Sequence, residues 1–176
     1  MATSPVNDIE KACVWWRDRV SSQWSTKATE INAKNSDDFD IQTAPEKIYL
    51  GDRLIEQYLR AGQVVVIIDY GMPPHTDVSE INWDMETYDI SISVVTGERR
   101  GDEEKVFRRI SRYFQVLREI VKEGEDAFRE SSRPAGGNAG VKAAMVSGFD
   151  STNSPEGEVI FRSATVKIGT QICVLA

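Results

Sequence analysis

The sequence contains few of the residues that usually perform catalysis or bind metal ions. Its 176 residues include one histidine and two cysteines. A zinc site needs several converging His, Cys or carboxylate ligands, and a Ser–His–Asp or Cys–His centre needs a histidine beside its nucleophile. His75, in PPHTD, is interpreted as a solvated loop side chain. We therefore predict no catalytic residues, no metal site and no cofactor.

Disulfides and membrane-spanning segments are not expected either. Cys13 and Cys173 lie near opposite ends of the chain, and two thiols do not form a disulfide framework in a protein of this size. No apolar run is long enough to span a bilayer, and the first residues, MATSPVNDIE, lack the basic and apolar regions of a signal peptide. We expect free, buried thiols, no membrane contact and folding in the reducing cytoplasm.

Positive charge is scarce as well, with 21 lysines and arginines against 28 acidic residues and a formal net charge of -7. Non-specific binding of nucleic acid requires clustered basic side chains that displace counterions. An acidic surface is instead compatible with a wall past which DNA slides without binding. Neither a Walker lysine nor a glycine-rich fingerprint follows VVVIIDYG, so no phosphate-binding loop is predicted.

The composition that remains is typical of one globular domain. Hydrophobic residues make up 40% and charged residues 28% of the chain, which suits a single domain and core over residues 1–176. Residues 1–7 are expected to be a short tail, and SSRPAGGNAG, at 131–140, a flexible loop.

Helical periodicity predicts an N-terminal amphipathic helix and a long helix in the second half of the chain. Trp15 lies outside the apolar face of the first helix, and Asp102 is expected to cap the second, which ends at Gly124 or continues through 128–130. A shorter helix is expected at 53–61, with Gly62 in a positive-φ conformation after it. The apolar face of the first helix consists of Ile9, Cys13, Trp16, Val20 and Trp24.

Strand patterns occupy most of the remaining chain. VVVII, at 64–68, predicts a buried central strand, and further strands are expected over 83–95, at 141–149, at 158–161 and from there to the end. Strands without regular crossover helices indicate a mixed, mostly antiparallel sheet with the long helix on one face. The predicted fold class is therefore α+β.

The strand over 83–95 changes phase along its length. From Tyr88 onward the apolar residues alternate in one phase, whereas Trp83 and Met85 belong to the other. A period of two cannot switch faces without a bulge or a change of surroundings. We expect that the first part of this strand either bulges or leaves the body as an arm, where Trp83 and Met85 would suit a partner.

Charged residues gather in two places. The stretch from Asp77 to Asp89 has five acidic residues and no basic one, and Asp84 and Glu86 alternate onto one strand face. Such charge usually keeps an edge strand soluble, although a small metal-dependent hydrolase built on Asp84, Glu86 and His75 is an alternative. In the long helix, six basic residues between Asp102 and Glu123 oppose five acidic ones, which favours a salt-bridged face or a protein interface over a phosphate track.

Three stretches give the chain a layout that resembles the tail terminator (tail completion) proteins of long-tailed bacteriophages. They are NDIEKACVWWRDRVSSQW, TYDISISVVTGERRGDEEKVFRRISRYFQVLREI and RSATVKIGTQICVLA. The resemblance implies a structural virion protein of the tail or neck, assembled in the host cytoplasm, that acts without catalysis. It implies a hexameric ring on the head-proximal end of the tail tube, which stops tube polymerisation and joins the head connector.

A ring needs a heterologous interface that closes on itself. Other neck proteins (a head-tail connector or stopper), a tail tube subunit and a monomeric host-directed binding module are alternatives to the terminator. The candidates for subunit or partner contacts are Trp15, Trp83, Met85, Arg99, Arg100, Arg108, Arg109 and Arg112. The candidates for an acidic lumen, through which DNA would pass without specific binding, are Asp77, Glu80, Asp84, Glu86 and Asp89.

Overall fold

The computed structural model describes residues 9–35, 37–51, 59–71, 75–79, 83–131, 140–150 and 159–175. It confirms the α+β class: a mixed, mostly antiparallel sheet packs against the long helix and the N-terminal helix. The helices are α1 (Ile9–Asn35) and α2 (Glu103–Ser131). The strands are β1 (Lys47–Leu50), β2 (Val64–Tyr70), β3 (His75–Ser79), β4 (Trp83–Arg99), β5 (Gly140–Asp150) and β6 (Val159–Leu175).

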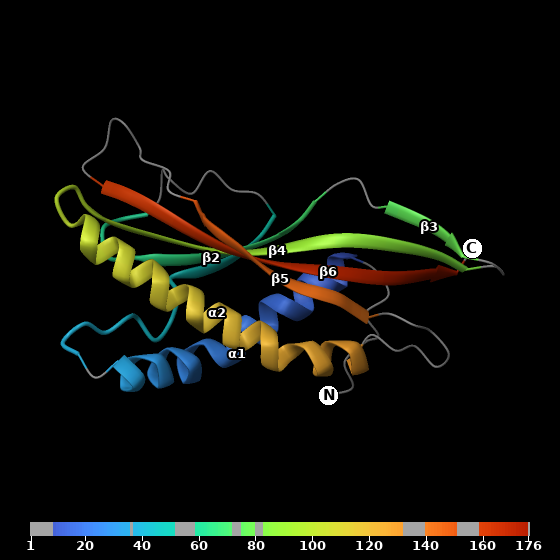
Figure 1. Ribbon diagram of the computed structural model, residues 1–176, viewed down its shortest axis with the longest axis horizontal. Coiled ribbons are helices and arrows are strands. Elements are labelled where there is room, and N and C mark those ends of the chain that lie inside the picture. The colour runs from blue at the N-terminus through green and yellow to red at the C-terminus, as the bar shows by residue number, and fades with distance from the viewer. Residues whose placement is uncertain are drawn as a thin grey trace.

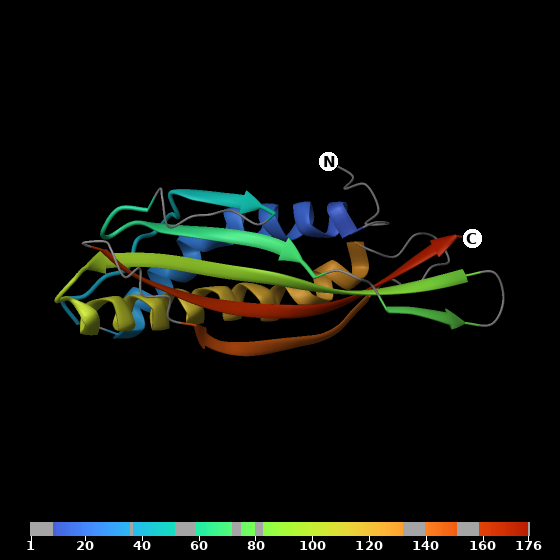
Figure 2. The same ribbon diagram turned by 90° about the horizontal axis from the view of Figure 1, so that it is seen from above.

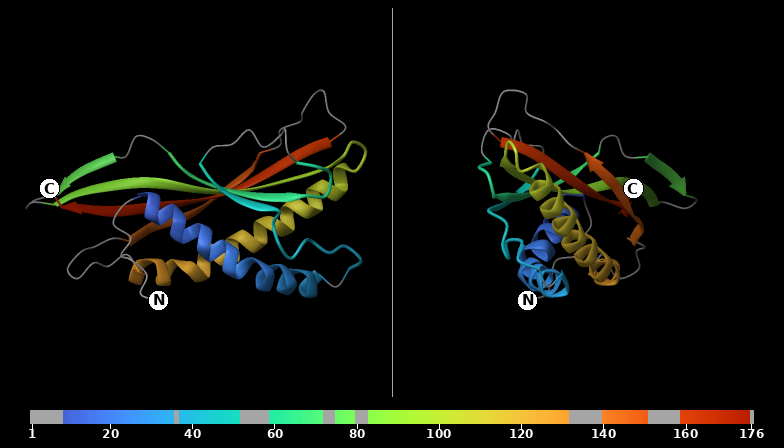
Figure 3. Two further views of the ribbon diagram at one scale, coloured as in Figure 1. Left: turned by 180° about the vertical axis from the view of Figure 1, so that it is seen from behind. Right: turned by 60° about the vertical axis from the view of Figure 1, so that its left-hand side comes forward.

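The sheet has the strand order β1-β2-β4-β6-β5, and β3 also pairs with β4. The β1–β2 pair is parallel, and the other pairs are antiparallel. Both helices lie on one face of this sheet (Figures 1 and 3). That face carries the apolar alternation, so Ile90, Ile92 and Val94 of β4 are fully buried beneath the helices.

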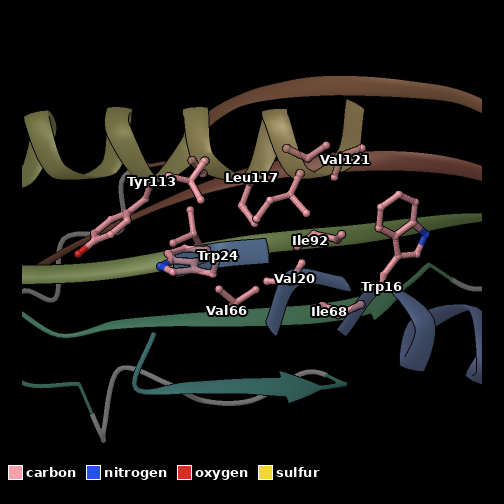
Figure 4. Packing of buried hydrophobic residues seen from close by; sticks show 14 of the residues in the cluster. Trp16, Val20, Trp24, Val66, Ile68, Ile92, Tyr113, Leu117 and Val121 are labelled. Atoms are coloured by element: carbon pink, nitrogen blue, oxygen red, sulfur yellow. The ribbon is translucent and has the colours of Figure 1, made fainter. Parts of the chain in front are cut away.

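The core between helices and sheet is rich in aromatic side chains (Figure 4). Trp24 of α1 lies 5.7 Å from Tyr113 of α2 between ring centroids, and Trp16 stacks on Phe128 at 5.3 Å. Each large side chain removed from water contributes roughly 1.5–3 kcal/mol of transfer free energy. The predicted apolar face of α1 is therefore its buried face, and Ile31 extends that face toward the end of the helix.

β4 and β6 pair along their whole length, from Trp83 with Leu175 to Arg99 with Val159, without a register shift. The expectation of two closing strands, one at 158–161 and one after it, is therefore wrong, because β6 is a single strand of 17 residues. The continuous register also excludes a bulge in β4. The irregularities occur in β5, between Val141 and Ala143 and between Ser147 and Phe149.

The phase change in β4 coincides with a change of neighbouring strand. β2 pairs with β4 over residues 90–96, whereas β3 pairs with residues 83–87. Figures 1 and 2 show that β3 and the adjoining ends of β4 and β6 extend beyond β2 and the helices. We call this part, residues 75–79, 83–87 and 171–175, the arm. Its surroundings differ from those of the body, which accounts for the reversed pattern.

Of the two ends considered for the long helix, the structure has the later one, because α2 continues past Gly124 to Ser131. The strand before it is longer than the predicted 83–95, because β4 continues through Arg99. Of the helix expected at 53–61, residues 59–60 are irregular and 61 begins a turn, while 52–58 lie outside the described residues. Gly62 has the predicted positive φ, at +85°.

Candidate interaction site

Three arginines of α2 surround one aromatic ring from the segment that follows α1. The guanidinium carbons of Arg108, Arg109 and Arg112 lie 4.8, 5.4 and 5.2 Å from the centroid of the Phe39 ring. A guanidinium at this distance is attracted to the negative face of an aromatic ring. We call Arg108, Arg109, Arg112 and Phe39 the arginine cluster.

Two carboxylates balance part of the charge of the arginine cluster. Arg108 and Arg112 both lie 2.5 Å from the same Oδ2 atom of Asp37, and Arg109 forms an ion pair with the buried Glu98. Arg112 also donates a hydrogen bond to the carbonyl oxygen of Phe39. The hydrogen bond from Arg112 is the main cause that lowers the pKa of Asp37 below its ordinary value.

The segment that carries Asp37 is fixed at its far end. Asn32 donates to the carbonyl oxygen of Ile41 and accepts from its amide, both at 3.0 Å. The Gln42 amide donates to the Tyr113 hydroxyl at 3.2 Å, and the Trp24 indole donates to the Gln42 carbonyl at 3.3 Å. Burial raises the pKa of this tyrosine, so its hydroxyl stays neutral at physiological pH. Ile41 and Gln42 therefore anchor the chain against both helices.

Burial differs within the cluster. The side chain of Arg112 is 7% exposed, whereas those of Arg108 and Asp37 are 41% and 36% exposed. The outer ion pair is therefore within reach of solvent and of another chain. The sequence placed these arginines away from the centre of the helix's apolar stripe, and in the structure they bind residues of their own chain.

Arg99 and Arg100, also candidates for subunit contacts, are both exposed. They lie at the turn between β4 and α2, at the opposite end of the molecule from the arm (Figure 1). Gly101 has φ of +103° and makes the turn with them.

Trp15 lies at the margin of the core. Its ring meets Trp16 edge-on at a centroid distance of 4.8 Å and Phe128 at 5.0 Å, and the side chain is partly buried. The end of α2 therefore covers part of the tryptophan that the sequence placed outside the helix face.

The acidic candidates fall on two phases of the arm sheet. The register pairs Asp77 with Met85 and Asp84 with Val78, so Asp77 is out of phase with Asp84 and Glu86. Asp89, which is exposed, is in phase with Asp77, and Glu80 lies outside the described residues. A lumen lined by one face of this sheet would therefore include only part of the set. For Trp83 and Met85 the structure describes the strand register but not the side chains.

The register of the arm does not favour the hydrolase alternative. His75 pairs with Thr87 and is out of phase with Asp84 and Glu86. Among the side chains that the structure describes, which do not include those of the arm, no group of three His, Cys, Asp or Glu could hold a metal ion. Burial raises the pKa of Cys13 to about 12, so this thiol is protonated near neutral pH and is a poor nucleophile.

No pattern in the sequence indicated the role of Asp37 and Phe39. They belong to NSDDFD, at 35–40, an acidic stretch without helical periodicity. An aromatic residue between carboxylates is the only local sign of a partner for arginines, and their contacts with Arg108 and Arg112 span more than seventy residues.

Neither comparison with known proteins identifies a family for this chain. No protein-family model matches it, and no curated protein matches it. Among the described residues, neither helix is long and apolar enough to cross a membrane.

Proposed function

We propose that this protein is a structural virion protein that acts as a phage tail terminator. In this function it forms a ring, expected to be hexameric, on the head-proximal end of the tail tube. The ring stops tube polymerisation and presents a docking face to the head connector. The observation that carries the proposal is the arm, a three-stranded extension of the sheet beyond the helices that cover the body.

The arm supports a subunit contact because of its strand edges. Within the described residues, β3 pairs only with β4, and β6 residues 172–175 pair only with β4. Unpaired backbone groups along a strand edge are a template for another chain. An extension at one end of an elongated molecule suits a contact with a different surface of the next copy. Repeated around an axis, such a heterologous contact closes a ring.

The charge of the chain suits a passage for DNA. The net charge is -7, and a surface with an excess of negative charge repels phosphates. Asp89 is exposed and follows the arm along β4, and Asp84 and Glu86 belong to the arm itself. In the proposed ring, the acidic residues of this region that take no part in subunit contacts line the lumen, and the partners are the tube protein and a connector of the neck.

Native mass measurement followed by negative-stain imaging tests the proposal. The expected result is a closed ring of about six subunits, formed alone or on added tube protein, and tubes whose length stops increasing when the protein is added. A strict monomer that never caps tubes would overturn the proposal. Self-polymerisation into open tubes would instead identify a tube subunit.

A double substitution tests the hydrolase alternative. Replacing Asp84 and Glu86 by Ala should change no turnover in hydrolysis assays with added divalent metal, because the proposed function involves no catalysis. Loss of a measurable hydrolytic activity with ring formation intact would favour the enzyme alternative over the terminator.

A further inference from the structure

The contact between Asp37 and the arginine cluster leaves positive charge in excess. Two guanidinium groups, those of Arg108 and Arg112, share one carboxylate oxygen. Among the described residues, the other oxygen of Asp37 accepts one long hydrogen bond of 3.3 Å, from the amide of Phe39. Arg109 is already paired with Glu98. The outer part of the cluster therefore has the donors for more carboxylate than its own chain supplies there.

We infer that the arginine cluster is a binding surface for the acidic arm segment of a second copy, and that Asp37 occupies this surface in the isolated chain. The inference rests on the proposed function in one respect, since it supplies the contact that joins neighbouring subunits of the ring. In the assembly, carboxylates from residues 77–89 of the neighbouring copy replace the carboxylate of Asp37 on Arg108 and Arg112.

Charge complementarity identifies the second copy as the occupant. The stretch 77–89 has five acidic residues and no basic one, and much of it belongs to the arm, outside the cover of the helices. Arginine binds carboxylates through paired donors in a fixed planar geometry, which makes it suited to such a segment. Asp37 provides the same chemistry from within the chain.

Distance makes the contact intermolecular. β4 leads from Trp83, at the tip of the arm, to Arg99, beside the start of α2, in a single strand of 17 residues. At about 3.3 Å per residue, this strand separates the two ends by roughly 50 Å. Figure 1 and the reverse view in Figure 3 place the arm and the segment after α1 at opposite ends of the molecule. An arm can therefore reach only the arginine cluster of another copy.

The exchange needs only a local movement. Ile41 is held by two hydrogen bonds with Asn32, so Asp37 can leave Arg108 and Arg112 while the chain from Ile41 onward stays in place. Arg108 and Asp37 are both part-exposed, which allows a competing carboxylate to enter from solvent. Because the cluster must first be vacated, the apparent affinity for the arm is the intrinsic affinity multiplied by the fraction of chains in which Asp37 has left the arginines. The contact thus restrains premature self-association.

A peptide with the sequence of residues 77–89, DVSEINWDMETYD, tests the inference. Its affinity is measured by fluorescence anisotropy for the full chain and for D37N, at low protein concentration. We expect D37N to bind the labelled peptide at least about tenfold more tightly than the unsubstituted chain. Adding R108Q to D37N should remove this gain. D18N, which changes an exposed carboxylate paired with Arg17 on α1, is the matched control and should leave the affinity unchanged.

Two results would overturn the inference. One is equal affinity of the peptide for D37N and for the unsubstituted chain, with circular dichroism showing that both are folded. The other is equally tight binding of a peptide with the same composition in scrambled order, which would indicate a general attraction between charges.

Native mass measurement distinguishes failure of this inference from failure of the proposed function. A ring formed by the unsubstituted chain, together with no gain in D37N, would sink the inference and leave the terminator intact. A gain in D37N that R108Q removes, with no ring or tube cap under any condition, would support the binding surface and sink the terminator.

Discussion

Gly124 lies in the interior of α2, where a residue with a side chain would normally favour the helix. Its role is to leave space for the indole of Trp16. A Cβ atom at this position would lie 2.9 Å from Cζ3 and 3.1 Å from Cη2 of Trp16, closer than carbon atoms pack. Trp16 is fully buried and stacked on Phe128, so it has little room to move.

We expect Gly124→Ala to destabilise the protein by about 1–3 kcal/mol through overpacking. Alanine also favours the helix over glycine by about 1 kcal/mol, and the expected destabilisation is the net effect after this gain is subtracted. Urea unfolding followed by circular dichroism measures the difference. Gln115→Ala, at an exposed position of the same helix, is the control and should change the stability by less than about 0.5 kcal/mol. A higher unfolding midpoint for Gly124→Ala would show that Trp16 yields to the added methyl group.

At the scale of elements, α1 and α2 are joined by a lysine that is largely withdrawn from solvent. Lys27 of α1 donates to Glu123 of α2 at 2.7 Å and to Glu30 at 3.0 Å, and its side chain is 10% exposed. The hydrogen bond to Glu123 is the main cause that raises the pKa of Lys27. The same bond lowers the pKa of Glu123 below its ordinary value of 4.5.

The pH dependence of this contact has a definite sign. Glu123 contributes stability above its ordinary pKa, and this contribution is lost as the pH falls through its lower folded pKa. The contribution of Lys27 is present below its ordinary pKa and is lost as the pH rises through its raised folded pKa. Both groups therefore contribute fully at neutral pH.

We predict that Glu123→Gln lowers the stability at pH 7 by less than about 1 kcal/mol, because this carboxylate is about half exposed and screened by water. The difference between the variant and the unsubstituted chain should vanish once the pH is below the folded pKa of Glu123. Thermal unfolding across pH 2 to 8 measures both quantities. Asp18→Asn, which removes an exposed carboxylate paired with Arg17, is the control, and a Glu123→Gln effect that persists in acid would exclude the ion pair as its cause.

The sequence predicted the helices and strands better than it predicted which strands pair with one another. The spacing of Trp16, Val20 and Trp24 predicts α1, and its buried face is the predicted one. The change of phase before Tyr88 indicated an altered environment, yet only the strand pairing shows that β4 is continuous and enters an arm. The continuity of β6 was not predicted, because the polar residues Arg162 and Ser163 interrupt the apolar pattern after Phe161. Local pattern cannot report which strand lies alongside.

The arginine cluster could be predicted only in part. Helical spacing put Arg108, Arg109 and Arg112 outside the apolar stripe, and their balance with acidic residues indicated ion pairs. Their actual partner, Asp37, depends on the path of the chain after α1. That path is set by hydrogen bonds of Asn32 with Ile41, which no periodic pattern records.

At the scale of the whole molecule, one cluster of buried residues includes both helices and three strands of the sheet. Ile92, on the central strand β4, is fully buried within it, between side chains of β2 and β6 and beneath the helices. Because the same core supports the helices and the sheet, its loss should unfold them together.

We predict that Ile92→Ala costs about 2–5 kcal/mol, the range for truncating a buried aliphatic side chain. Tryptophan fluorescence and far-ultraviolet circular dichroism should give one coincident unfolding transition, for this variant and for the unsubstituted chain. Lys167→Ala, at an exposed position of the adjacent strand β6, should leave the midpoint nearly unchanged. Separate transitions for the two probes would contradict a single cooperative unit.

The ladder between β4 and β6 has a mechanical consequence. It joins the tip of the arm to the turn at Arg99 through 17 consecutive residue pairs. Antiparallel hydrogen bonds run perpendicular to the strands, so a pull along the strands loads the whole row in shear at once. A bend at the arm, in contrast, acts on its few outermost pairs. We therefore expect the β4–β6 pair to resist tension along the strands, whereas the tip of the arm bends sideways more easily.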